Sequence, residues 1–98
     1  MSIRVVANNY IREGKEAEFL ALAKEMVEKT NALDEGCISY ALCRDLADPL
    51  HVAMIEEWTT NELLMKHMQA KHFVELIPQM GALTYSDKEV LTIFETVF

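Results

Sequence analysis

Two histidines and the only tryptophan are the residues of this sequence best suited to chemistry. Trp58, His67 and His72 lie close together in the segment EEWTTNELLMKHMQAKHF. An imidazole titrates near neutral pH, so a histidine beside an apolar pocket can accept a proton from a substrate. His67 falls on the apolar stripe of a predicted helix, one residue before Met68. This position fits both a hydrogen-bonded core histidine and a general base, and the pattern alone does not separate them.

The second histidine is harder to place. On a continuous helix His72 lies about 140° round from His67, so the two rings share a face only if the helix breaks near QAKH. Taken by itself, His72 is typical of a surface or capping residue. Trp58 ends a predicted strand, where it either fills the core or forms a wall on which a planar ligand stacks.

Two asparagines interrupt an otherwise good strand near the start of the chain. Asn8 and Asn9 are poor strand formers, and strand propensity gives no reason for either. Since neighbouring residues of a strand face opposite sides, we expect at least one to point into a helix-side cavity or at an interface between subunits. Local departures of this kind often mark functional sites, although a turn or bulge explains them equally well.

Composition excludes several classes of function. The net charge of −7 repels phosphate backbones and anionic lipid heads, so we expect no nucleic acid and no membrane among the partners. The start of the chain lacks the apolar segment of a secretory signal, which predicts a cytoplasmic protein. No glycine-rich nucleotide motif and no histidine or cysteine spacing typical of metal sites occurs, so we predict neither a cofactor nor a metal.

Apolar periodicity predicts the order β-α-β-β-α-β in one domain over residues 1–98. The strands are expected over 2–11, 37–44, 51–58 and 88–98, and the first helix over 15–33. A Thr-x-x-Glu capping box from Thr59 to Glu62 predicts the start of the second helix, which should kink or end near Pro78 and stop at Gly81. This order is that of an α+β, ferredoxin-like fold, a four-stranded antiparallel sheet with two helices on one face.

The strands carry apolar residues on both faces. A sheet with one face in water normally has a polar face there. The economical explanation is that a second copy covers the open face, so we predict a homodimer. The apolar end of the chain, Val97 and Phe98, fits burial at or near that interface.

The chain also resembles a known family. The segments EGCISYALCRD, IEEW and HMQAKHF, with an acidic helix start between the last two, resemble the antibiotic biosynthesis monooxygenase family, over about Ile3 to Val97. The resemblance implies a dimeric α/β barrel with a cavity between sheet and helices in each subunit. It also implies that Asn9 points into the cavity, that Trp58 is the cavity aromatic, and that His67 and His72 line it from the helix. Substrate contacts are expected from Trp58, Tyr40, Met68 and Phe73.

Several members of that family oxygenate phenols or quinols without metal or flavin. The resemblance therefore implies a cofactor-independent monooxygenase of a small aromatic or quinol, with His67, His72 and Asn9 as catalytic residues. Relatives that degrade haem carry an iron-ligating histidine where this chain has Ile77, so haem degradation is not expected. Two alternatives stay open: a non-catalytic protein that binds a small molecule, and an isomerase or lyase of a small metabolite on the same fold.

Overall fold

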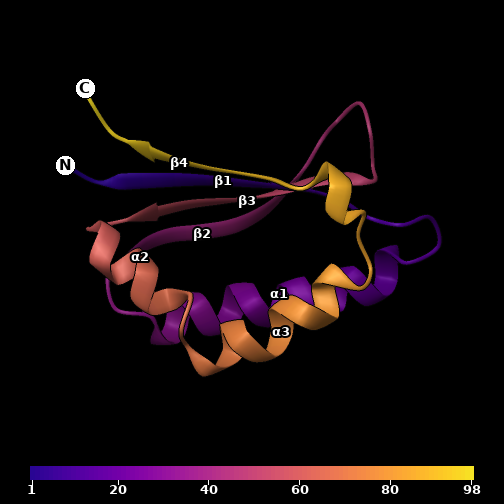
Figure 1. Cartoon of the computed structure of the whole chain (residues 1–98), viewed down its shortest axis with the longest axis horizontal. Coiled ribbons are helices and arrows are strands. Elements are labelled where there is room, and N and C mark those ends of the chain that lie inside the picture. Colours follow the sequence, from indigo (N-terminus) through magenta and orange to yellow (C-terminus); the bar gives the residue numbers. More distant parts are fainter.

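An antiparallel sheet with helices on one face forms the whole molecule (Figure 1). The computed structural model describes all residues from Met1 to Phe98. Its strands are β1 (Ile3–Tyr10), β2 (Cys37–Arg44), β3 (His51–Trp58) and β4 (Val90–Glu95), in the sheet order β2-β3-β1-β4. Its helices are α1 (Glu16–Leu33), α2 (Asn61–His67) and α3 (Lys71–Gly81), followed by a single 3-10 turn, η1 (Ser86–Lys88). The predicted α+β, ferredoxin-like fold is confirmed, with the second helix divided in two.

The sequence left open whether the second helix breaks near QAKH, and in the structure it does. Between α2 and α3 the chain makes a tight turn, in which the N–H of Gln69 donates to the Lys66 carbonyl and that of Ala70 to the His67 carbonyl. The end of α3 at Gly81 agrees with the prediction, and Pro78 lies inside the helix without ending it.

The cap of α2 also differs from the prediction, by one residue. Its N-cap is Thr60, whose side chain accepts a hydrogen bond from the Leu63 N–H at 3.2 Å. Thr59, the predicted N-cap, instead still belongs to the β-sheet side of the junction. Its N–H donates to the carbonyl of Gly36, the residue directly before β2. Glu62 still stands in the first turn, where a carboxylate interacts favourably with the helix dipole.

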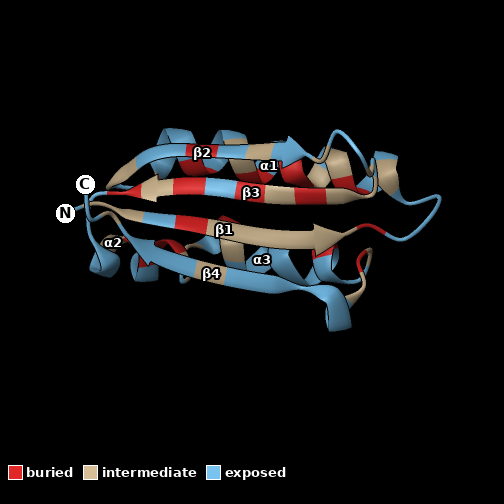
Figure 2. Ribbon diagram, turned by 90° about the horizontal axis from the view of Figure 1, so that it is seen from above, coloured by how far each residue is buried: buried red, intermediate tan, exposed pale blue.

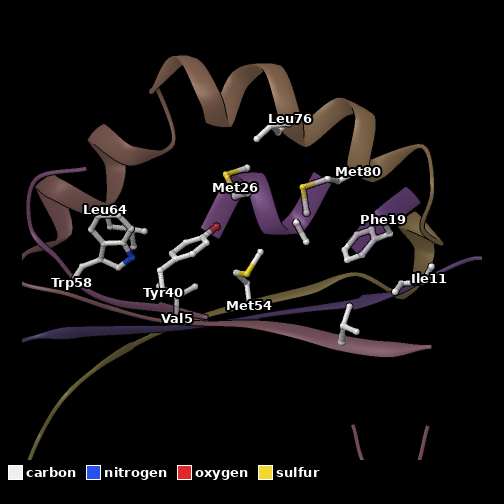
Figure 3. Close-up of a cluster of buried hydrophobic side chains, with 12 residues drawn as sticks. Val5, Ile11, Phe19, Met26, Tyr40, Met54, Trp58, Leu64, Leu76 and Met80 are labelled. Carbon is white, nitrogen blue, oxygen red and sulfur yellow. The ribbon is translucent and has the colours of Figure 1, made fainter. Parts of the chain in front are cut away.

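The core lies between the sheet and the helices (Figure 3). Alternate strand residues point toward the helices, so that Val5 and Ala7 of β1 share this face with Met54 and Trp58 of β3. From the other side come apolar residues of the helices, including Phe19, Ala23, Met26, Leu64, Leu76 and Met80. This layer is where a cavity can form.

The other face of the sheet has no helix over it (Figure 2). It exposes about half of each of three large apolar side chains, Ile55, Val90 and Phe94. Val97 and Phe98, which follow β4, are also exposed. Both faces of the sheet are therefore apolar, as the sequence predicted. No helix of the fold combines the length and the apolar character needed to cross a membrane.

Candidate functional site

A cavity of about 150 Å³ lies between the sheet and the helices. Most of its lining is apolar, and four of its residues are methionines, whose flexible thioethers adapt to ligands of irregular shape. An apolar cavity of about this size holds a benzene-sized molecule. The lining residues are Ala7, Asn9, Phe19, Met26, Tyr40, Met54, Glu56, Met68, Phe73, Ile77, Met80, Gly81, Glu89 and Leu91.

Glu56 is the buried carboxyl group of this cavity. The alternation of β3 places it on the helix side of the sheet, opposite Val5 on one neighbouring strand and Tyr40 on the other. Only 6% of the residue is exposed, and its Oε1 accepts a hydrogen bond of 2.9 Å from Trp58 Nε1. Burial raises the pKa of Glu56 to about 7, against the opposing effect of the Trp58 hydrogen bond. Glu56 can therefore accept or release a proton near neutral pH.

Two polar side chains of the cavity complete its hydrogen-bonding capacity. The Tyr40 hydroxyl points from the sheet toward the helices (Figure 3), and burial, with a contribution from Glu56, raises the pKa of this phenol. Tyr40 therefore stays protonated and is available as a donor. Asn9 faces the same side of the sheet, and its Nδ2 makes only a long bond of 3.4 Å, to the Ala7 carbonyl. Asn8 faces the opposite side, where its Oδ1 lies 2.8 Å from His51 Nε2.

His67 and His72 meet outside this cavity, on Asp34. His67 Nδ1 donates to Asp34 Oδ2 at 2.5 Å, and His72 Nε2 donates to the same oxygen at 3.0 Å. Both histidines are buried. The expectation that His72 is a surface or capping residue was therefore wrong, because the turn between α2 and α3 redirects its side chain inward. The break near QAKH that a shared histidine site requires does occur.

The end of α1 brings Asp34 to the two histidines. Asp34 is the C-cap of α1, and the chain turns at once through Gly36, which has φ of +83°. A Cβ atom at Gly36 would lie 2.4 Å from Leu63 Cδ1, so only glycine lets this turn approach α2 so closely. The turn thus sets Asp34 against the end of α2.

The histidine cluster stands directly behind the cavity wall. The His67 ring packs against three aromatic rings, at centroid distances of 4.7 Å from Trp58, 4.9 Å from Phe73 and 5.2 Å from Tyr40. Phe73 and Tyr40 line the cavity, and Trp58 holds Glu56. Burial lowers the pKa of His67 more than its bond to Asp34 raises it, so His67 is neutral at pH 7. It supports the wall of the cavity without lining it.

Asp34, His67 and His72 also have the side-chain types of a metal site, with ligating atoms within 4.8 Å of one another. Two observations favour a hydrogen-bonded cluster. Both rings contact one oxygen of Asp34, and His67 Nε2 is buried without any partner. A histidine that binds a metal through Nδ1 carries a proton on Nε2, and it normally donates that proton to an acceptor.

The structure thus divides the predicted site residues into two groups. Asn9, Tyr40, Met68 and Phe73 line the cavity. Trp58, expected as the cavity aromatic, is instead a fully buried core residue that donates a hydrogen bond to the lining residue Glu56. His67 and His72 belong to the Asp34 cluster. Glu56 itself was missed, although its place between Met54 and Trp58 on an inward-facing strand pattern was a usable signal.

The chain is similar to one protein family and to several proteins of known structure. Residues 2–79 match the model of the antibiotic biosynthesis monooxygenase family. The fold is similar to a conserved protein from Methanosarcina mazei Go1, with a TM-score of 0.93 and 32% identity over 99% of this chain and 94% of that one. An antibiotic biosynthesis monooxygenase matches with a TM-score of 0.89 and 30% identity, over 97% of this chain and 98% of its own.

A protein from Mycobacterium tuberculosis shares the fold at 20% identity, with a TM-score of 0.90 over 100% of this chain and 97% of that chain. A comparison with curated proteins found no significant match. The match of the family model extends from the start of β1 into α3 and so includes both the Glu56 strand and the histidine cluster. The chain therefore belongs to the antibiotic biosynthesis monooxygenase family.

Proposed function

We propose that this protein is a cofactor-independent monooxygenase, which binds a small phenol or quinol in the cavity and oxygenates it with O₂. The observation that carries the proposal is Glu56, a buried carboxyl group on an apolar cavity wall with its pKa raised to about 7. A general base acts best when its pKa lies near the working pH. Family membership supports the same type of reaction.

In the proposed reaction Glu56 takes the hydroxyl proton of the substrate, and Tyr40 and Asn9 stabilise the resulting oxyanion by hydrogen bonds. The electron-rich ring then passes one electron to O₂. The radical pair joins in a C–O bond, and the O–O bond breaks with loss of water. A phenol and O₂ thus give a quinone and water, and all four electrons come from the ring. The proposed reaction needs no outside reductant.

This assignment moves the proton acceptor from the histidines to Glu56. His67 and His72 each donate a hydrogen bond to Asp34, and neither lines the cavity. We infer that they act indirectly, because the His67 ring packs on Tyr40 and Phe73. Ile77, which lines the cavity where haem-degrading relatives have their histidine, offers no ligand to iron.

Turnover of a phenol and quinol panel under air and under argon tests the proposal. We expect one O₂ consumed for each product formed, and one atom of ¹⁸O in the product when ¹⁸O₂ is supplied. Product formed equally under argon would reject the monooxygenase and indicate an isomerase or lyase. Calorimetric binding without turnover of any panel member would instead indicate a small-molecule binding protein.

We also propose that two copies associate through the open face of the sheet. Ile55 lies at the centre of that face on β3 and is 46% exposed in the single chain. An exposed apolar surface of this kind is typical of a subunit interface. Family members form dimers of this general type, which supports the proposal.

Light scattering at micromolar concentration tests the dimer. The wild-type protein should have the mass of two chains, whereas Ile55→Glu should have the mass of one, because the buried charge would have no partner. Val74→Glu is the matched control, since Val74 is a similarly exposed apolar residue on α3. It should remain a dimer. A stable wild-type monomer would refute the proposed interface.

A further inference from the structure

The cavity has an opening to solvent that carries a negative charge. Four of its lining residues are exposed, namely Ile77, Gly81, Glu89 and Leu91. Ile77 and Gly81 belong to α3, Glu89 immediately precedes β4 and Leu91 lies in it, so the mouth lies between α3 and the start of β4. Glu89 is the charged residue of this mouth, and it takes part in no ion pair with any basic side chain of the protein.

No positive charge balances the carboxyl groups of the cavity. Its lining contains Glu56 at the sheet and Glu89 at the mouth, but no lysine, arginine or histidine. Lys88, the neighbour of Glu89, is directed elsewhere, with its ammonium group 5.1 Å from the centre of the Tyr85 ring and 5.7 Å from that of Tyr10. A ligand in the cavity therefore meets only negative charge.

We propose that Glu89 selects substrates by charge, so that the cavity accepts neutral or positively charged phenols and rejects those that carry a carboxylate or phosphate. This inference rests on the proposed function. The cavity has room for about one aromatic ring. If the substrate hydroxyl lies at Glu56, any substituent on the far side of the ring must extend through the mouth beside Glu89.

Charge selection follows from the positions of the two carboxyl groups. Proton transfer from the substrate hydroxyl neutralises Glu56 and leaves the charge on the substrate oxygen. The inner end of the cavity therefore holds a single negative charge before and after that step. An anionic substituent at the mouth adds a second charge close to Glu89, where partial exclusion of water weakens screening. An ammonium group at the same place is attracted instead. The chemical class favoured is thus an uncharged or amine-bearing phenol.

Three phenols with side chains of similar length test the selection: hydroxyphenylpropionate, its neutral amide, and tyramine. Their affinities would be measured by calorimetry under argon, which prevents turnover. For the wild type we expect the anion to bind about fivefold more weakly than the amide. This factor corresponds to the interaction free energy typical of partly exposed charge pairs. Tyramine should bind at least as tightly as the amide. Salt at about 0.5 M should reduce both differences, since it shortens the screening length.

Substitutions at the mouth give the decisive comparison. Glu89→Gln should bring the three affinities closer together, and Glu89→Lys should reverse their order. Glu28→Lys changes the net charge equally from the exposed side of α1, and it should keep the wild-type order. If the wild type binds all three ligands alike, or if Glu28→Lys acts as Glu89→Lys does, charge selection by Glu89 is overturned. If the neutral amide does not bind either, the assignment of the cavity as the substrate site fails as well.

Discussion

Replacing Glu56 with glutamine is expected to lower kcat about 100-fold or more, because the variant keeps the shape of the side chain but loses the proton acceptor. In the wild type, kcat/KM should rise with pH through about 7, as Glu56 ionises. The glutamine variant should lack this rise. Steady-state O₂ uptake with the best substrate of the panel, measured across the pH range, gives both quantities.

The same substitution should stabilise the fold at high pH. This effect on stability can be measured separately from the role of Glu56 as proton acceptor in turnover. A carboxyl group whose pKa is raised from 4.5 to about 7 binds a proton in the folded state that the unfolded chain has released. Its stabilising contribution is complete below pH 4.5 and is lost as the pH rises through 7. The difference corresponds to about 3 kcal/mol. Glu56→Gln should therefore be more stable than the wild type at pH 8 and equally stable at pH 4.5.

Two further variants control this experiment. Glu57→Gln changes the neighbouring residue on the open face, where Glu57 contacts Ser2 and Arg4, and it should keep wild-type rates. Trp58→Phe removes the hydrogen bond that lowers the pKa of Glu56, so the rise in kcat/KM should move to higher pH. Wild-type turnover in Glu56→Gln would rule out Glu56 as the base.

Asp34→Ala is expected to lower the free energy of unfolding by about 3 kcal/mol, because it leaves two buried N–H donors, on His67 and His72, without an acceptor. The side chain of Asp34 is only 9% exposed, so water cannot readily replace the carboxylate. Urea denaturation at pH 7, followed by the fluorescence of Trp58, measures the loss.

Glu35→Ala is the matched control. Glu35 is the next residue along the chain, its side chain is 71% exposed, and its pairing with Lys66 across 3.6 Å contributes little in water. We expect a change within about 0.5 kcal/mol for this variant. A loss below about 1 kcal/mol in Asp34→Ala would mean that the cluster does not hold α2 and α3 against α1.

Much of the fold could be predicted because the strands are short runs rich in apolar and β-branched residues, bounded by turn signals, and α1 has apolar residues at helical spacing. The alternation in HVAMIEEW, for example, places Met54 and Trp58 on the core side, as observed. The division between α2 and α3 could not be predicted in the same way. Met68, Gln69 and Ala70 are all compatible with a helix, and the turn depends on tertiary contacts of the flanking histidines with Asp34, which is distant in sequence.

The candidate site was predicted in part for a similar physical reason. Asn9 drew attention because asparagine is a poor strand former, and the family resemblance then placed it in the cavity and added Tyr40; both line the cavity. Glu56 is also an inward polar residue on a strand, but its neighbour Glu57 makes the pair resemble the polar end of a strand. Only the burial of Glu56 and its bond to Trp58 distinguish the two residues. The role of Asp34 was hidden because an acidic residue before a glycine is also a usual way to end a helix.

The mouth between α3 and β4 opens on the helix side of the sheet, away from the face through which we propose that two copies associate. In such a dimer each cavity would be built from one chain and would open to solvent by its own route. Loading one subunit would then change nothing at the other. Substrate saturation should follow a simple hyperbola, and a heterodimer with one inactive subunit should retain half of the activity.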